Sequence, residues 1–178
     1  FIIDPGDEAD FITTEILNLK LKPQGILLTH GHYDHCLACL ELKLNFNLPI
    51  FLDQKDVFLY QKAAQSASHW SQTKAFSQPP TTAYPSAVKI GDKKLEIIPT
   101  PGHTPGSICL KIDNLLFTGD TLFQDSVGRT DFSYSEPQDL KRSLKKISSL
   151  PPETIAYPGH GPIFSLSSSP LCSLTPSP

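Results

Sequence analysis

Four residues of the kinds that bind metal ions lie within six positions, directly after a short apolar segment. The segment is Ile26 to Thr29, and it is followed by His30-Gly31-His32-Tyr33-Asp34-His35. In extended backbone, residues two apart point the same way, so the first two histidines could hold one ion while the later turn faces another. Histidine is scarce and such a cluster has little packing value, so we interpret it as a metal site and not as a solvated loop.

The same arrangement recurs along the chain, because further potential ligands follow apolar segments in Gly/Pro-rich frames. His103 stands in Pro101–Gly106 and His160 in Pro158–Gly161, so of the six histidines only His69 lies outside such a setting. Asp120 follows an apolar strand in the same way. A lone Asp after a strand is usually a turn former, but beside five histidines we interpret Asp120 as a ligand.

Apolar periodicity predicts an α/β (α+β) chain with two sheets packed together and helices outside. In the first half, strands near 1–3, 26–29 and 50–52 alternate with a helix whose apolar positions are Phe11, Ile12, Ile16 and Leu19 and with a helix near 37–44. In the second half, we expect hairpin strands at 88–90, 95–98, 108–112 and 115–117, then a helix and a strand at 154–157. Ser135, Pro137 and Gln138 form a capping pattern for that last helix.

Two segments carry little pattern. Residues 65–86 are rich in Ser, Gln, Thr and Pro and are predicted to be a long loop. Residues 163–178 are rich in Ser and Pro and are predicted to be a disordered tail, which leaves one domain over residues 1–162. The chain begins at Phe1 and contains no Met, so we expect an upstream segment of the natural protein to be missing.

Charge and composition exclude several classes of protein. With 15 Lys+Arg against 18 Asp+Glu, the chain has no cationic surplus for nucleic acid. No apolar run approaches the roughly 20 residues that a membrane helix needs. Four scattered cysteines do not resemble a secreted disulfide framework, which favours a reducing, cytoplasmic location.

Together the motifs resemble the metallo-beta-lactamase superfamily in their order and spacing. They are Thr29 to His35, the frame of His103, Thr118-Gly119-Asp120 and Pro158-Gly159-His160-Gly161. The segment from Gly128 to Phe132 resembles more narrowly the glyoxalase II-like hydrolases and the related persulfide dioxygenases. The resemblance implies an αβ/βα sandwich whose N-terminal strands are truncated in this chain.

The resemblance also implies a ligand set and two catalytic carboxylates, Asp34 and Asp120. By position, one metal ion would be held by His30, His32 and His103, the second by Asp34, His35 and His160, and Asp120 would bridge them. Imidazole and carboxylate ligands suit zinc, although iron or manganese would accept the same set.

Two such ions would share a water and lower its pKa towards about 7, so a bridging hydroxide would be the nucleophile. We expect a metal-dependent hydrolase of small-molecule thioesters of the hydroxyacylglutathione type. One alternative is a mononuclear-iron persulfide dioxygenase with iron on His30, His103 and Asp120. A further alternative is an inactive metal-binding scaffold.

Other residues with chemical potential have structural interpretations. Cys36 and Cys39 form a C-x-x-C, but no second pair exists, so packing of small thiols on a helix is favoured. Arg129 is expected to pair with Asp131 or Asp125 more than to bind substrate. Tyr33 and Tyr157, which flank ligands, are expected to be buried aromatic residues.

Overall fold

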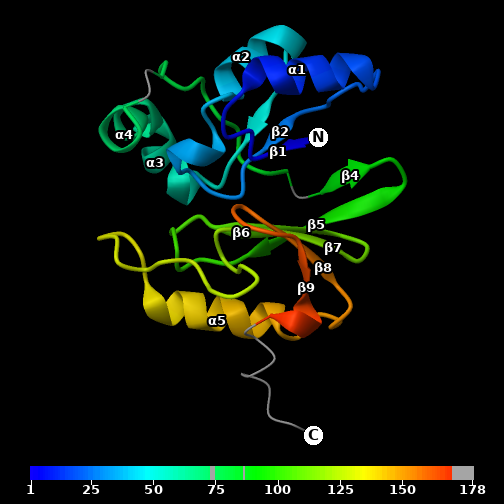
Figure 1. Ribbon diagram of the computed structural model, residues 1–178, viewed down its shortest axis with the longest axis vertical. Coiled ribbons are helices and arrows are strands. Elements are labelled where there is room, and N and C mark those ends of the chain that lie inside the picture. The colour runs from blue at the N-terminus through cyan, green and yellow to red at the C-terminus, as the bar shows by residue number, and fades with distance from the viewer. Residues whose placement is uncertain (73–74, 86, 170–178) are drawn as a thin grey trace, which may run out of the picture. The chain divides into compact units, whose positions relative to one another are not determined.

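The computed structural model describes residues 1–72, 75–85 and 87–169, and the chain forms two compact units, Phe1–Tyr84 and Pro85–Pro178 (Figure 1). The first unit contains β1 (Ile2–Ile3), α1 (Ala9–Asn18), β2 (Ile26–Leu27), the 3-10 helix η1 (Tyr33–His35), α2 (Cys39–Phe46), β3 (Ile50–Phe51), η2 (Gln54–Asp56), α3 (Val57–Gln61) and α4 (Ala63–Trp70). Within the described residues, no helix combines the length and the apolar character needed to cross a bilayer.

The first unit is built on a parallel sheet in the order β1-β2-β3. Ile2 pairs with Ile26, which pairs with Ile50 in turn. Parallel neighbours require crossover connections, and α1 and α2 provide them on one side of this sheet (Figure 1). Ile26, Leu28 and Ile50 pack into one apolar core with residues of these helices, such as Ala9 and Leu42. Because all three strands run the same way, the segments that follow them leave from one edge of the sheet.

The buried stripe of α1 differs from the predicted one. Ala9 and Ile16 are buried and Ile12 packs against the core, whereas Phe11 and Leu19 are 63% and 64% exposed. The stripe is set by spacings of three and four residues from Ala9, which leave Phe11 on the solvent side.

The predicted loop over residues 65–86 is wrong in its first part, because residues 65–70 belong to α4. Ala63 and Ala67, four residues apart, are fully buried, so a small-residue stripe packs the helix although its other residues are polar. Farther along, Thr82 continues the sheet, since its N–H donates to Ile50 O and its O accepts from Leu52 N. Residues 73, 74 and 86 of the predicted loop lie outside the described residues.

The described part of the second unit contains a sheet in the order β4-β5-β6-β7-β8-β9 and one long helix. Its elements are β4 (Val88–Ile90), β5 (Lys93–Pro99), β6 (Ile108–Ile112), β7 (Leu115–Gly119), α5 (Pro137–Ile147), β8 (Ile155–Pro158), β9 (Phe164–Ser165) and the 3-10 helix η3 (Leu166–Ser168). Only β7 and β8 pair in parallel among these strands. Helix α5 covers one face of the sheet, where Leu140, Leu144 and Ile147 pack with Ile98 and Leu116 (Figure 1).

The first part of the predicted disordered tail is ordered, which corrects the boundary at residue 162. Strand β9 pairs antiparallel with β8, and Phe164 and Leu166 are buried in the core under α5. Two apolar side chains among serines are enough to anchor the segment. Residues 170–178 lie outside the described residues.

The start of α5 is capped differently from the predicted pattern. The Glu136 carboxylate accepts a hydrogen bond from Gln138 N at 3.1 Å, so Glu136 is the N-cap and Ser135 is not. The Ser135 hydroxyl instead donates to His103 O at 2.6 Å. Ser135 does not cap the helix because its hydroxyl donates to His103 O, an acceptor from a distant part of the chain. This hydrogen bond attaches the start of α5 to the segment around His103.

Candidate metal centre

His30 and His32 come together directly after β2, as the alternation in the sequence predicts. His32 has an extended backbone, and the two ring centroids lie 4.8 Å apart. His30 Nε2 and His32 Nδ1 are separated by 3.1 Å. Two nitrogens that share one zinc ion, each at about 2.0–2.1 Å, lie about 3.0–3.4 Å apart, so this pair fits an ion without rearrangement.

Asp4 orients the histidines of this cluster, a role that the sequence analysis missed. Its carboxylate accepts from Thr29 N at 2.7 Å and from the Thr29 hydroxyl at 2.6 Å, and it also accepts from His35 Nδ1 at 3.1 Å. Asp4 has a left-handed backbone (φ 45°), which places its side chain against the end of β2. The only available signal was that an Asp directly follows the first strand.

These hydrogen bonds determine which nitrogen each ring presents. The Thr29 hydroxyl donates its one proton to Asp4. Its 3.0 Å contact with His30 Nδ1 therefore requires the ring nitrogen to be the donor. His35 Nδ1 likewise donates to Asp4. Both rings, each at most 2% exposed, therefore keep the Nε2 lone pair for a metal ion.

The turn between His30 and His32 is held by a buried carboxylate that the sequence analysis also missed. Gly31 N donates to Asp56 Oδ2 at 2.9 Å, and Asp56 is fully buried. A Cβ at Gly31 would lie 2.5 Å from Asp56 O, so no larger residue fits. The Asp56 side chain, at the end of η2, thus fixes the backbone between the two histidines.

Asp34 and His35 lie on η1, and the backbone of η1 packs against the turn that follows β1. A Cβ at Gly6 would lie 2.3 Å from Asp34 O, and Leu37 N donates to Gly6 O at 2.9 Å. The His35 ring lies 4.2 Å from the His30 ring, centroid to centroid. The first unit thus gathers four predicted ligands: His30, His32, Asp34 and His35.

The second unit gathers the other three predicted ligands, His103, Asp120 and His160. Asp120 follows β7 and His160 follows its parallel neighbour β8, so both leave from the same edge of the sheet. Asp120 Oδ2 lies 3.7 Å from His103 Nε2 and 3.7 Å from His160 Nε2. A carboxylate oxygen and an imidazole nitrogen on one ion are separated by up to about 3.7 Å, so this oxygen is placed to serve an ion on either side.

His103 is fixed by contacts around its whole frame. Its Nδ1 donates to Arg129 O at 2.8 Å, which leaves Nε2 as the metal-binding nitrogen. Helix α5 holds the frame through Glu136 N, which donates to Gly102 O at 2.8 Å. A Cβ at Gly102 would lie 2.3 Å from Leu140 N, and φ is 140°, so only glycine allows this approach.

Gly128 is a further residue of this centre that the sequence analysis did not single out for a role. A Cβ there would lie 1.9 Å from Asp120 O and 3.1 Å from His103 Cβ. Gly128 N also donates to Thr121 O at 3.3 Å. The Gly128–Phe132 segment therefore presses directly on the backbone of one ligand and the side chain of another.

Arg129 has the structural role that was predicted, with Asp131 as its partner. Two hydrogen bonds of 2.6 Å join its guanidinium to the carboxylate, and the guanidinium also lies 4.5 Å from the centre of the Phe132 ring. The hydrogen bonds from Arg129 lower the pKa of Asp131 to about 2, and the same bonds raise the pKa of Arg129.

Cys36 and Cys39 are packing residues, as predicted, and Cys109 is one as well. Cys36, Cys39 and Cys109 are free and fully buried, and burial raises the pKa of each thiol, that of Cys109 to about 11. A protonated, buried thiol neither binds metal nor attacks a substrate. Cys172 lies outside the described residues.

Tyr33 and Tyr157 are half-buried, so the prediction that they are buried aromatic residues is wrong. The Tyr157 ring stacks at 5.2 Å on Phe117, and the Tyr33 hydroxyl lies 2.8 Å from Ser71 Oγ.

The sequence model of the metallo-beta-lactamase superfamily matches residues 1–160, which contain all seven of these ligand candidates. The chain belongs to the metallo-beta-lactamase superfamily. Its fold is that of the superfamily, as the resemblance implied, and superfamily members are metal-dependent hydrolases that bind a dinuclear metal through His and Asp.

The chain is similar to several named proteins and solved structures. The hydroxyacylglutathione hydrolase GloC of Haemophilus influenzae is 35% identical over 90% of this chain and 79% of its own length. The crystal structure of TTHA1623 in a di-iron-bound form is 35% identical with a TM-score of 0.86, covering 94% of this chain and 87% of that one. ETHE1 from Myxococcus xanthus is 26% identical with a TM-score of 0.71, covering 93% and 68%.

Proposed function

We propose that the chain is a metal-dependent thioester hydrolase whose two clusters together hold two divalent metal ions. One ion is assigned to His30, His32 and His103, the other to Asp34, His35 and His160, with Asp120 shared. The observation that carries the proposal is the hydrogen bonding of His30, His35 and His103, whose Nδ1–H groups all donate to oxygen acceptors. Neutral imidazoles fixed in this tautomer are prepared as metal ligands, and a solvated polar loop does not need such support.

The donor set indicates the kind of ion. Five imidazoles and two carboxylates suit zinc, and iron or manganese accept the same set. Bound there, two such ions would lower the pKa of water towards about 7 and polarise a substrate carbonyl. The two carboxylates leave part of the charge of two divalent ions uncompensated, which favours the anionic transition state of acyl transfer.

The residues of the chain supply positioning. Asp4 holds His35 in one tautomer directly and His30 through the Thr29 hydroxyl. Arg129 O does the same for His103. Asp34 and Asp120 are the catalytic carboxylates of the proposal. Asp120 Oδ2 lies equally far from two ligand nitrogens and is therefore proposed as the bridge.

A thioester of the hydroxyacylglutathione type is the preferred substrate. The Gly128–Phe132 segment supports this choice, and so does the similarity to a relative named hydroxyacylglutathione hydrolase. A thiolate is a good leaving group and needs little help from an acid, which agrees with a site built only from metal ligands and their supports. The buried reduced thiols are compatible with a cytoplasmic enzyme of small molecules, which is part of the proposal.

The second candidate is a mononuclear-iron persulfide dioxygenase, because the Gly128–Phe132 segment resembles these enzymes as well. In that case His30, His103 and Asp120 would form a two-histidine, one-carboxylate face for iron, and Asp34, His35 and His160 would lie around it.

One experiment separates the two candidates. The protein is loaded with zinc or with iron, and thioester cleavage of S-lactoylglutathione and oxygen uptake with glutathione persulfide are measured on both forms. The hydrolase proposal expects thioester cleavage that is lost in His160→Ala. Oxygen uptake that survives His160→Ala, with no thioester cleavage under zinc, would replace it with the dioxygenase. Full metal uptake without either reaction would indicate a scaffold.

A further inference from the structure

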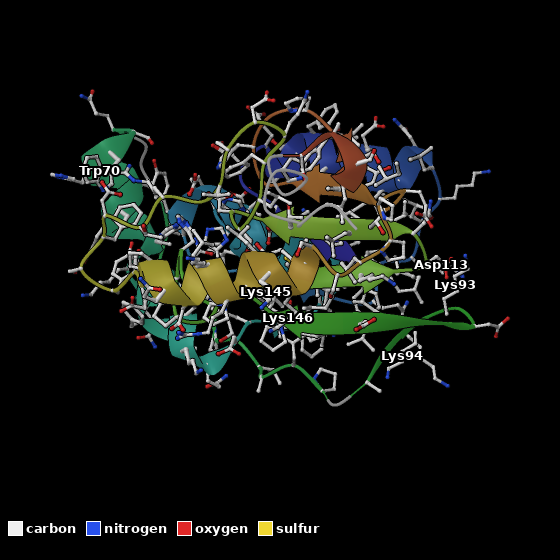
Figure 2. All side chains as sticks on the ribbon, turned by 90° about the horizontal axis from the view of Figure 1, so that it is seen from below. Trp70, Lys93, Lys94, Asp113, Lys145 and Lys146 are labelled. Carbon is white, nitrogen blue, oxygen red and sulfur yellow. The ribbon has the colours of Figure 1, made fainter. Side chains whose placement is uncertain are left out.

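The only Trp of the chain stands on the surface. Trp70 is the last residue of α4 and is 70% exposed (Figure 2). An indole exposed to this degree leaves a large apolar surface in water, which an apolar part of a ligand could cover.

Helix α4 is attached to the turn that carries the ligands. It packs against η1, and the Tyr33 hydroxyl lies 2.8 Å from Oγ of Ser71, the residue after Trp70. Tyr33 itself stands between His32 and Asp34. The path from the Tyr33 backbone through its side chain and the Ser71 side chain to the Trp70 backbone spans at most about 15 Å. An acylated thiol such as a tripeptide thioester is at least as long.

The indole contacts a second ring, and the ten residues of sequence around it are uncharged. The His69 ring meets it edge to face, with centroids 4.8 Å apart and planes at 87°. From Ala63 to Gln72 the chain has no Asp, Glu, Lys or Arg. Such a surface favours an alkyl or aryl group over a charged one.

We propose that Trp70 is a specificity-determining residue that binds the apolar end of the thioester substrate. The proposal rests on the thioester hydrolase function and adds that substrates with a longer alkyl or aryl group are preferred. The apolar group can belong to the acyl side or to the thiol side of the thioester, and the assay includes an arm for each.

The first test uses Trp70 as its own reporter, because no other Trp contributes to the emission. Zinc-loaded protein is titrated with non-hydrolysable S-alkyl thioethers of one thiol, from methyl to hexyl. We expect the emission to shift to shorter wavelength, and the apparent Kd to fall about twofold per added methylene, as for a chain half-covered by the ring. An emission that stays unchanged at concentrations that inhibit thioester cleavage would overturn the proposal.

The second test compares variants over two thioester series. One series varies the acyl chain on a fixed thiol, and the other varies the thiol on a fixed acyl group. For each series, the ratio of kcat/KM for the longest substrate to kcat/KM for the shortest is measured. In the series whose chain contacts Trp70, this ratio should fall at least fivefold in Trp70→Ala. Trp70→Phe should restore part of it. The matched control is Leu44→Ala, since Leu44 is 72% exposed in the same unit and should leave the ratio unaltered.

The outcomes distinguish the two proposals. If the wild type cleaves the thioesters and Trp70→Ala shows the same dependence on chain length, the role of Trp70 is overturned. The hydrolase function is then unaffected. Failure of the wild type to cleave any member of either series would overturn the hydrolase function itself, whatever the fluorescence shows.

Discussion

At the scale of single residues, Asp4 is the residue on which the largest part of the first cluster depends. Replacement of Asp4 by Asn keeps a residue that tolerates a left-handed backbone but removes one acceptor oxygen and the charge. We expect the affinity for zinc to fall about 10- to 100-fold, because His35 or Thr29 loses its acceptor. Competition with a chromophoric chelator measures the affinity, and circular dichroism confirms the fold.

Asp113 offers a matched control for that variant. It too has a left-handed backbone, at φ 51°, and its exposed carboxylate pairs with Lys93 (Figure 2). Asp113→Asn should leave zinc affinity unaltered. Equal loss of affinity in the two variants would refute the orienting role of Asp4.

Gly128 gives a second prediction at this scale. The added methyl of Gly128→Ala meets Asp120 O at 1.9 Å, so the backbone of a ligand must move. We expect a loss of about 1–3 kcal/mol in the free energy of unfolding, as for overpacked sites, together with weaker metal binding. Gly91→Ala is the control, because its Cβ meets nothing within 4 Å and only the φ of 61° opposes it. Denaturant midpoints that fall equally in both variants, with unaltered metal binding, would contradict this account.

At the scale of elements, the buried thiols on α2 and β6 and beside η1 predict a dependence of stability on pH. Burial raises the pKa of Cys109 from 9.0 to about 11 and also raises those of Cys36 and Cys39. Above pH 9 the unfolded thiols ionise while the folded ones stay protonated, so the unfolded state is favoured. The free energy of unfolding should therefore fall as pH rises from about 9 to 11.

Urea unfolding at pH 7, 9 and 10 measures this dependence. A variant with Cys36, Cys39 and Cys109 replaced by Ala is less stable at pH 7. Its free energy of unfolding should nevertheless fall less between pH 9 and 10 than that of the wild type. An equal loss in both proteins would show that the thiols are not its cause.

The elements also show how far the sequence predicts the fold. Strand β6 has the predicted bounds because its apolar run is bordered by polar turns, and α5 keeps its predicted apolar face. Helix α4 and strand β9 were missed because their anchoring residues, two alanines and two apolar residues among serines, give weak local patterns. The ligand candidates could be found because they cluster after strands. Their supports, Asp4, Asp56 and Gly128, act through contacts distant in sequence, which a single chain does not reveal.

For the whole molecule, the main proposal is that the seven ligand candidates hold two metal ions. Elemental analysis of the purified protein, after incubation with zinc and removal of excess metal, tests it most directly. We expect close to two ions per chain, and a lower content in both His35→Ala and His103→Ala, each of which removes one proposed ligand. A wild-type protein that binds no transition metal, or that keeps two ions per chain in both variants, would contradict it.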